Sequence, residues 1–157
     1  MKVFFNEKQI KAACLISESI KVLNSYNDYR NFNNDFMIRG ILSEIAVKIM
    51  IGIRPNFDVF FDKLGDNGND LLGFDIKSIM PNHKRLVIYP NEYLKTKGYI
   101  VVSLTKDFKT CEFKGFIFSK DFKNKFISED LGFGIRQTIL LENLMNFENF
   151  LFYVKKS

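Results

Sequence analysis

Cysteine and histidine are scarce in this chain of 157 residues, which contains two cysteines, Cys14 and Cys111, and a single histidine, His83. This set is too small for a disulfide framework, and it offers no CxxC pair from which a zinc finger could be built. The lack of a disulfide framework is typical of proteins that work in a reducing compartment. We therefore expect an intracellular, cytoplasmic protein.

Long apolar runs are missing as well. No segment approaches the roughly 20 apolar residues that a helix needs to span a bilayer. The first residues, Met1 to Phe5, are followed by the polar Asn6, Glu7 and Lys8, and this change comes too early for a signal peptide. We therefore expect a soluble protein without a membrane partner.

The chain does contain enough apolar residues for one core, together with an excess of positive charge. With 157 residues, 46% of them apolar, and with no repeat or linker, the sequence predicts a single domain over residues 1–157. The net charge of +5 and the pI near 9.1 favour an anionic partner such as a nucleic acid. Charge by itself does not identify that partner.

Two helices are predicted in the first third of the chain. The first is expected to begin after Asn6, which forms a variant capping box with Gln9, and its apolar residues recur at helical spacing as far as Leu23. A polar loop follows. The second helix is expected from Asp35 to Met50, with Gly52 closing it.

The rest of the chain alternates between strand-like and helical segments. Strands are predicted over Asp58–Phe61, Phe74–Met80, Arg85–Tyr89, Tyr99–Leu104 and Cys111–Phe118. Short helical stretches are predicted over Asn91–Lys95, Ser119–Lys125 and Leu140–Phe150. This order predicts an α/β or α+β fold, in which a β-sheet is flanked by helices.

Acidic and basic residues are segregated along the chain. Residues 57–75 contain five acids and one base, whereas residues 76–125 contain eleven bases and four acids. Divalent cations such as Mg²⁺ take oxygen ligands, and phosphates attract lysine and arginine. An acidic segment beside a basic one is therefore what a metal site facing a phosphate backbone would need.

Asp75 and Lys77 are the centre of this pattern. Side chains alternate along a strand, so these two are expected on one face of the strand Phe74–Met80, and their neighbours on the other. Asp70 lies an odd number of positions from Asp75, so it requires a turn or bulge to share that face. Gly73 is placed to supply that turn.

Such a group of side chains suits the hydrolysis of phosphodiester bonds. Two or three carboxylate oxygens hold a Mg²⁺ ion, which polarises the phosphoryl oxygen and acidifies a water molecule. A neighbouring lysine orients that water or stabilises the charge of the transition state. The residues therefore indicate a metal-dependent phosphodiesterase that acts on nucleic acid.

Three motifs occur in a particular order. They are Gly40-Ile41-Leu42-Ser43-Glu44-Ile45-Ala46, Gly68-Asn69-Asp70 and Asp75-Ile76-Lys77-Ser78. In this order they resemble the PD-(D/E)XK nuclease superfamily, which includes restriction endonucleases and Holliday-junction resolvases, over roughly residues 35–104. The resemblance implies a restriction endonuclease-like fold, with a central mixed sheet flanked by helices, and cleavage of DNA that depends on Mg²⁺ or Mn²⁺. It also implies that Asp70, Asp75 and Glu44 bind the metal and that Lys77 lies beside the nucleophilic water.

Each of these residues also has a simpler interpretation. Glu44 and Lys48 are four residues apart on the predicted helix and could form an ordinary surface ion pair. Asp75 and Lys77 could be the outward face of a half-buried strand. Asp66 is a rival for the first metal ligand, although with its neighbours it also has the composition of a turn.

The expected substrate and partners follow from the same interpretation of the sequence. Nucleic acid, with DNA favoured, is the expected partner, and we predict that four basic residues contact it: Lys84, Arg85, Lys95 and Lys97. A homodimer would present two cutting sites to a duplex. The alternative function is a non-catalytic nucleic-acid-binding or protein-interaction module on the same fold, which cleavage dependent on a divalent metal would exclude.

Overall fold

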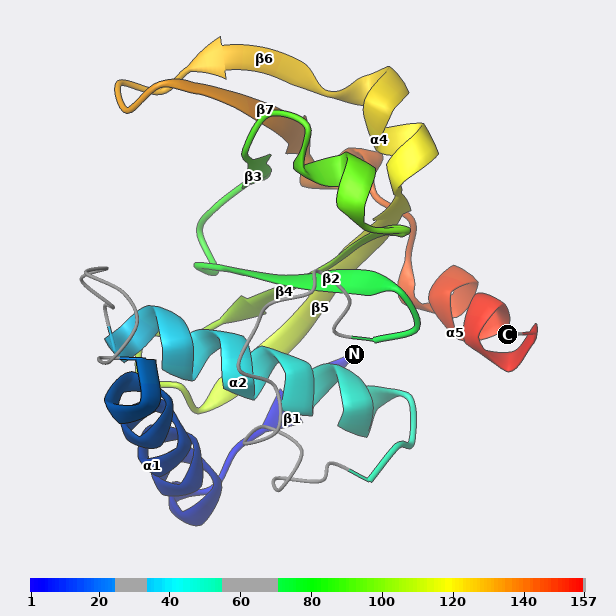
Figure 1. Cartoon of the computed structure of the whole chain (residues 1–157). Helices are drawn as coiled ribbons and strands as arrows, with labels where there is room; N and C mark the ends of the chain where they lie inside the picture. Colours follow the sequence, from blue (N-terminus) through cyan, green and yellow to red (C-terminus); the bar gives the residue numbers. More distant parts are fainter. Residues whose placement is uncertain (25–33, 55–70, 157) are drawn as a thin grey trace.

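The computed structural model describes residues 1–24, 34–54 and 71–156 (Figure 1). The strands are β1 (Lys2–Phe4), β2 (Phe74–Ile79), β3 (Arg85–Ile88), β4 (Gly98–Leu104), β5 (Thr110–Phe118), β6 (Ile127–Asp130) and β7 (Ile135–Leu140). The α-helices are α1 (Glu7–Asn24), α2 (Asn34–Met50), α4 (Ser119–Lys125) and α5 (Phe147–Lys156). Two short 3-10 helices are η1 (Glu92–Lys95) and η2 (Leu141–Asn143).

The strands of the described residues form two sheets. The first sheet has the order β1-β5-β4-β2 and is mixed, because β2 runs parallel to β4 while β4, β5 and β1 pair antiparallel. The second sheet has the order β3-β7-β6 and is antiparallel. The strands predicted around Asp75, and after it as far as β5, are all present, with ends that differ by one residue from those expected.

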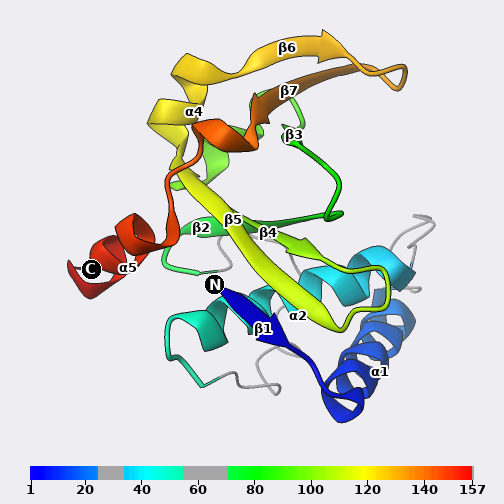
Figure 2. The same cartoon turned by 180° about the vertical axis from the view of Figure 1, so that it is seen from behind.

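The first sheet lies in the middle of the molecule. Figures 1 and 2 show α1 and α2 on one side of it, and the second sheet with α4 on the other side. Helix α5 packs near β5. The predicted α+β architecture, a central mixed sheet flanked by helices, is therefore confirmed.

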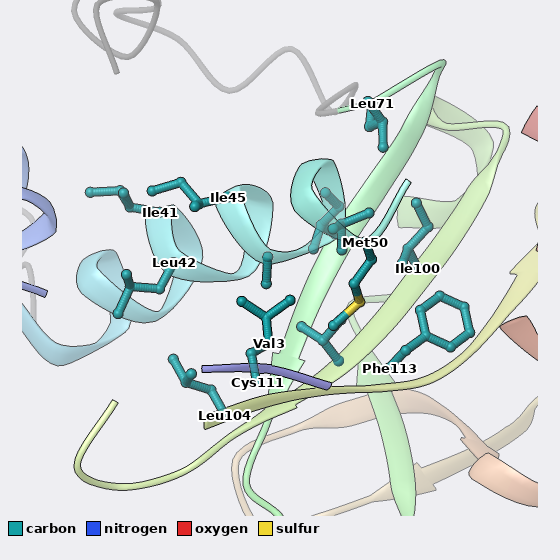
Figure 3. Close-up of a cluster of buried hydrophobic side chains, with 14 of the residues drawn as sticks. Val3, Ile41, Leu42, Ile45, Met50, Leu71, Ile100, Leu104, Cys111 and Phe113 are labelled. Carbon is teal, nitrogen blue, oxygen red and sulfur yellow. The ribbon is translucent and has the colours of Figure 1, made fainter. Parts of the chain in front are cut away.

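Among the residues that the structure describes, buried side chains form two clusters, one on each face of the first sheet. The larger cluster joins α2 to Ile76 of β2 and Ile100 of β4 (Figure 3). The smaller cluster joins Tyr99 and Val101 of β4 to Leu86 of β3 and to other residues of the second sheet and α4. Because side chains alternate along β4, the two faces of this strand contribute to different clusters.

The ends of the first two helices follow the predicted signals. The Asn6 N–H donates to Gln9 Oε1, and the Gln9 N–H donates to Asn6 Oδ1, each at 2.9 Å, so the capping box begins α1 as expected. Gly52 has φ 78, and the Ile53 N–H bonds the Lys48 carbonyl at 2.8 Å. This left-handed glycine ends α2, as the sequence predicted.

The predicted helix Leu140–Phe150 is wrong in its first part, since only its last residues, 147–150, belong to α5. Leu140 is the last residue of β7, where it pairs with Arg85 of β3, and η2 follows it. Helix α5 begins only at Phe147, because the Asn146 side chain accepts the Asn149 N–H at 3.0 Å and so caps the helix there. The apolar residues near Leu140 thus belong to a strand and a turn.

Three strands were not predicted: β1, β6 and β7. The last two form a hairpin whose connection contains Gly132 and Gly134, both with positive φ. Their short lengths and mixed polarity give a weak sequence signal, and pairing with β3 stabilises β7. The predicted strand Asp58–Phe61 and the loop before Asp35 lie outside the described residues.

Candidate functional site

Asp75 and Lys77 lie on one face of β2, as predicted. Their register partners in the parallel strand β4 are Tyr99 and Val101, which belong to the smaller cluster. Ile76 between them belongs to the larger cluster against α2. Asp75 and Lys77 therefore face the second sheet and η1.

The ammonium group of Lys77 is held between two carboxylates. Lys77 Nζ lies 2.8 Å from Asp75 Oδ2 and 2.5 Å from Glu92 Oε1. The second oxygen of Glu92 accepts the Tyr89 N–H at 3.1 Å, so the backbone after β3 fixes this carboxylate. The side chains are 13% exposed for Asp75, 24% for Glu92 and 29% for Lys77, which means that water screens them only in part.

Tyr99 completes this group, which we call the Lys77 cluster and define as Asp75, Lys77, Glu92 and Tyr99. The Tyr99 side chain is fully buried, and Lys77 Nζ lies 6.0 Å from the centre of its ring. Within the described residues, its hydroxyl group has no hydrogen-bond partner. Buried hydroxyl groups usually have one, so this group stands out.

Opposing effects set the ionisation of the cluster. Burial disfavours the charged form of Lys77, but Asp75 and Glu92 together outweigh burial, so the pKa of Lys77 is raised. Burial, followed by the negative charges of Glu92 and Asp75, raises the pKa of Tyr99 far above its ordinary range. At neutral pH the lysine is thus charged and the phenol neutral.

A tight turn leads into β2. Leu71 and Phe74 exchange two backbone hydrogen bonds, at 3.1 and 2.8 Å, across Leu72 and Gly73, whose φ angles are 53 and 87. Positive φ at both central positions is the pattern of a turn that reverses the chain into a hairpin. The turn predicted at Gly73 is therefore confirmed. Asp70 and its rival Asp66 lie outside the described residues.

Glu44 lies on the other side of the first sheet. It belongs to α2, which packs on the face of β2 opposite to Asp75 and Lys77. Its carboxylate forms the simple ion pair with Lys48, at 4.0 Å, that its spacing on the helix allowed. The structure thus brings Asp75 and Lys77 together but places Glu44 apart from them.

The four predicted phosphate-binding residues fall into two pairs. Lys84 and Arg85 are exposed at the start of β3, where Arg85 forms an ion pair with Glu129 at 2.6 Å. Lys95 and Lys97 are exposed around the end of η1. The side-chain carbons of Lys97 cover Gly73, since a Cβ atom there would lie 2.8 Å from Lys97 Cδ. Lys97 is therefore next to the turn into β2.

Sequence reasoning did not find Glu92 and Tyr99 as members of the site. Glu92 is the only acid between Ile76 and Lys106, and an isolated acid in a basic segment is the signal that could have drawn attention to it. The sequence pattern around Tyr99 indicates only an ordinary apolar residue of a buried strand. Both contacts with Lys77 depend on tertiary structure, because β4 pairs beside β2 and η1 brings Glu92 to the Lys77 side chain.

The Lys77 cluster has oxygen ligands of the kind that a magnesium ion needs. Among the residues that the structure describes, no group of three histidine, cysteine, aspartate or glutamate side chains could hold a metal. Asp75 and Glu92 nevertheless supply two carboxylates within 2.8 Å of one cationic atom. Mg²⁺ is commonly bound through one or two carboxylates and several water molecules, so these residues fit it.

Comparisons of the chain with protein-family models, curated proteins and solved structures gave no match. In the described part of the chain, no helix is both long and apolar enough to cross a membrane.

Proposed function

We propose that this protein is a nuclease of the PD-(D/E)XK type, which hydrolyses phosphodiester bonds in DNA with Mg²⁺ or Mn²⁺ as its cofactor and acts inside the cell. One observation carries the proposal. Asp75 and Lys77 meet at 2.8 Å on one face of a strand that begins directly after a hairpin turn. Such a pair suits metal-assisted hydrolysis, in which the carboxylate holds the metal and the lysine stabilises developing negative charge.

The proposal assigns the second carboxylate to Asp70. Leu71 pairs with Phe74 across the turn. Asp70 directly precedes Leu71 in the sequence, and the proposal takes it, as the resemblance implies, to share one cation with Asp75.

Each residue then has a separate task. Asp70 and Asp75 would hold the cation, which supplies Lewis-acid activation of the phosphate and of a water molecule. Lys77, which is charged at neutral pH, would stabilise the negative charge that develops on the phosphate. Lys97, next to the turn, and Lys95 would attract the DNA backbone, and Lys84 and Arg85 would extend that contact along β3. A second copy of the chain would supply the second cut in a duplex.

One observation favours the alternative function, a non-catalytic binding module. Lys77 is engaged by two carboxylates, as in an ion-pair network that only stabilises the fold. In such a module, the loss of Lys77 would affect stability and leave no cleavage to measure.

Cleavage of labelled DNA tests the proposal. Wild-type protein should cut with Mg²⁺ or Mn²⁺, and Ca²⁺ should largely fail to support cutting because of its looser geometry. Lys77→Ala should lower the single-turnover rate by roughly 10²- to 10³-fold, while DNA binding measured in Ca²⁺ is kept. Ser78→Ala is the control, because Ser78 pairs with Val102 of the larger cluster and lies on the opposite face. A folded Lys77→Ala protein that cuts at the wild-type rate would refute the assignment.

A further inference from the structure

The position of the Lys77 ammonium resembles that of a bound cation. Its nitrogen lies 2.8 and 2.5 Å from oxygens of two different carboxylates, which come from β2 and η1. A Ca²⁺ ion lies about 2.3–2.6 Å from its oxygen ligands. Asp75 and Glu92 are therefore spaced so that a divalent cation could take the place of the ammonium with little movement of either carboxylate.

The hydroxyl group of Tyr99 is a second and independent indication. Tyr99 is fully buried, and its hydroxyl group lacks a hydrogen-bond partner among the described residues. Asp75 is its register partner in the parallel pair, so the phenol lies on the same face as the two carboxylates. Leaving a buried hydroxyl unsatisfied is costly, and an oxygen of a hydrated cation would satisfy it.

We infer that Asp75 and Glu92 form a divalent-cation site for which the Lys77 ammonium competes, and that Glu92 is a metal ligand of the proposed nuclease. This inference rests on the proposed function and deepens it. It replaces Glu44, which lies on the other side of the sheet, with Glu92, which contacts Lys77 directly.

The competition has a consequence for Lys77. When a cation takes the two carboxylates, Lys77 loses its partners and its ammonium becomes available to an anion such as the phosphate of the substrate. Binding of the metal and release of Lys77 from the carboxylates then occur together, because the cation replaces the ammonium. A lysine that merely braces the fold would instead hold the same contacts whether or not a cation binds.

Tb³⁺ is a suitable probe because the chain has six tyrosines and no tryptophan. Excitation of tyrosine close to bound Tb³⁺ produces terbium luminescence, and Mg²⁺ or Mn²⁺ added afterwards competes for the site. Tyr99→Phe should reduce the luminescence per bound ion. Tyr153→Phe should not, because Tyr153 packs in the larger cluster on the opposite face of the sheet.

The affinities of three variants for Tb³⁺ and Mn²⁺ test whether Asp75 and Glu92 form the cation site. Glu92→Gln should weaken binding at least about tenfold, since the loss of even a group that only supports a metal ligand costs about 10- to 100-fold. Lys77→Met should tighten binding by roughly tenfold, because removal of a neighbouring positive charge favours a cation. Glu112→Gln is the matched control, since Glu112 also pairs with a lysine, Lys114, at 2.6 Å, and it should leave the affinity unchanged.

Each outcome separates this inference from the proposed function. If Glu92→Gln binds Tb³⁺ and Mn²⁺ as wild type does, or if the wild-type protein binds neither ion, the inference is overturned. If the predicted affinity changes appear but no DNA is cut under any metal condition, the cation site stands and the nuclease proposal fails. Should Glu92→Gln unfold, Glu92→Asp and the gain in affinity of Lys77→Met still test the competition.

Discussion

Replacement of Lys77 by methionine removes the ammonium group but keeps a side chain of similar length against Tyr99. The carboxylates of Asp75 and Glu92, 13% and 24% exposed, then face each other without their shared cation. Exposed ion pairs contribute roughly 0.2–1 kcal/mol, and loss of one partner of a buried pair costs about 3–5 kcal/mol. The partial exposure of the cluster places the expected loss in free energy of unfolding at about 2 kcal/mol.

The loss in free energy of unfolding caused by Lys77→Met should depend on pH. In wild type, the raised pKa of Lys77 means that its contribution is fully present below the pKa of an unfolded lysine and is lost as pH rises through the folded pKa. Wild type should therefore keep this contribution between pH 5 and 8. In Lys77→Met, the two ionised carboxylates repel each other, and protonation at lower pH reduces this repulsion. The variant should therefore lose less free energy of unfolding, relative to wild type, at pH 5 than at pH 8.

Urea unfolding followed by circular dichroism at these two pH values measures the effect. Lys114→Met is the matched control, because Lys114 is 25% exposed but faces one nearby carboxylate, that of Glu112, which Lys2 also approaches at 3.8 Å. The control should lose at most about 1 kcal/mol. A Lys77→Met protein as stable as wild type at pH 8, or a deficit that is the same at both pH values, would refute the electrostatic account of the cluster.

Two further predictions concern the core and the first helix. Asn6→Ala should lower the free energy of unfolding by about 1 kcal/mol, because the Gln9 N–H loses its acceptor; an unchanged urea midpoint would show that this cap does not hold α1. Cys111 is fully buried, and burial raises its pKa to about 12, so a thiol reagent at pH 8 should label Cys14 first and Cys111 only as the protein unfolds. Mass spectrometry of the labelled peptides checks this, and rapid labelling of Cys111 in folded protein would contradict it.

The sequence predicted well those features that depend on near neighbours. The Asn6–Gln9 cap, the glycine that ends α2, the turn at Gly73 and the shared face of Asp75 and Lys77 each involve residues no more than a few positions apart. Steric preferences and side-chain alternation act at this range. For this reason the strand that carries the candidate site could be located from its residues alone.

Features that depend on tertiary contacts were not predicted. Leu140 is apolar and close to helical residues, yet pairing with Arg85 makes it part of a strand. Glu92 reaches Lys77 because η1 folds back over β2, and no spacing rule connects residues so far apart in the chain. Helical periodicity gave Glu44 a position on α2 but did not indicate which face of the sheet the helix covers.

Cleavage of labelled DNA by the wild-type protein and by Asp75→Asn, each in Mg²⁺ and in EDTA, tests the central claim most directly. We expect the wild-type protein to cut in Mg²⁺ and to stop in EDTA. Asp75→Asn should stay folded and bind DNA at least as well, because a negative charge near the phosphates is removed, but it should not cut. Equal cutting by wild type in Mg²⁺ and EDTA, or wild-type cutting by Asp75→Asn, would contradict a metal-dependent site on β2.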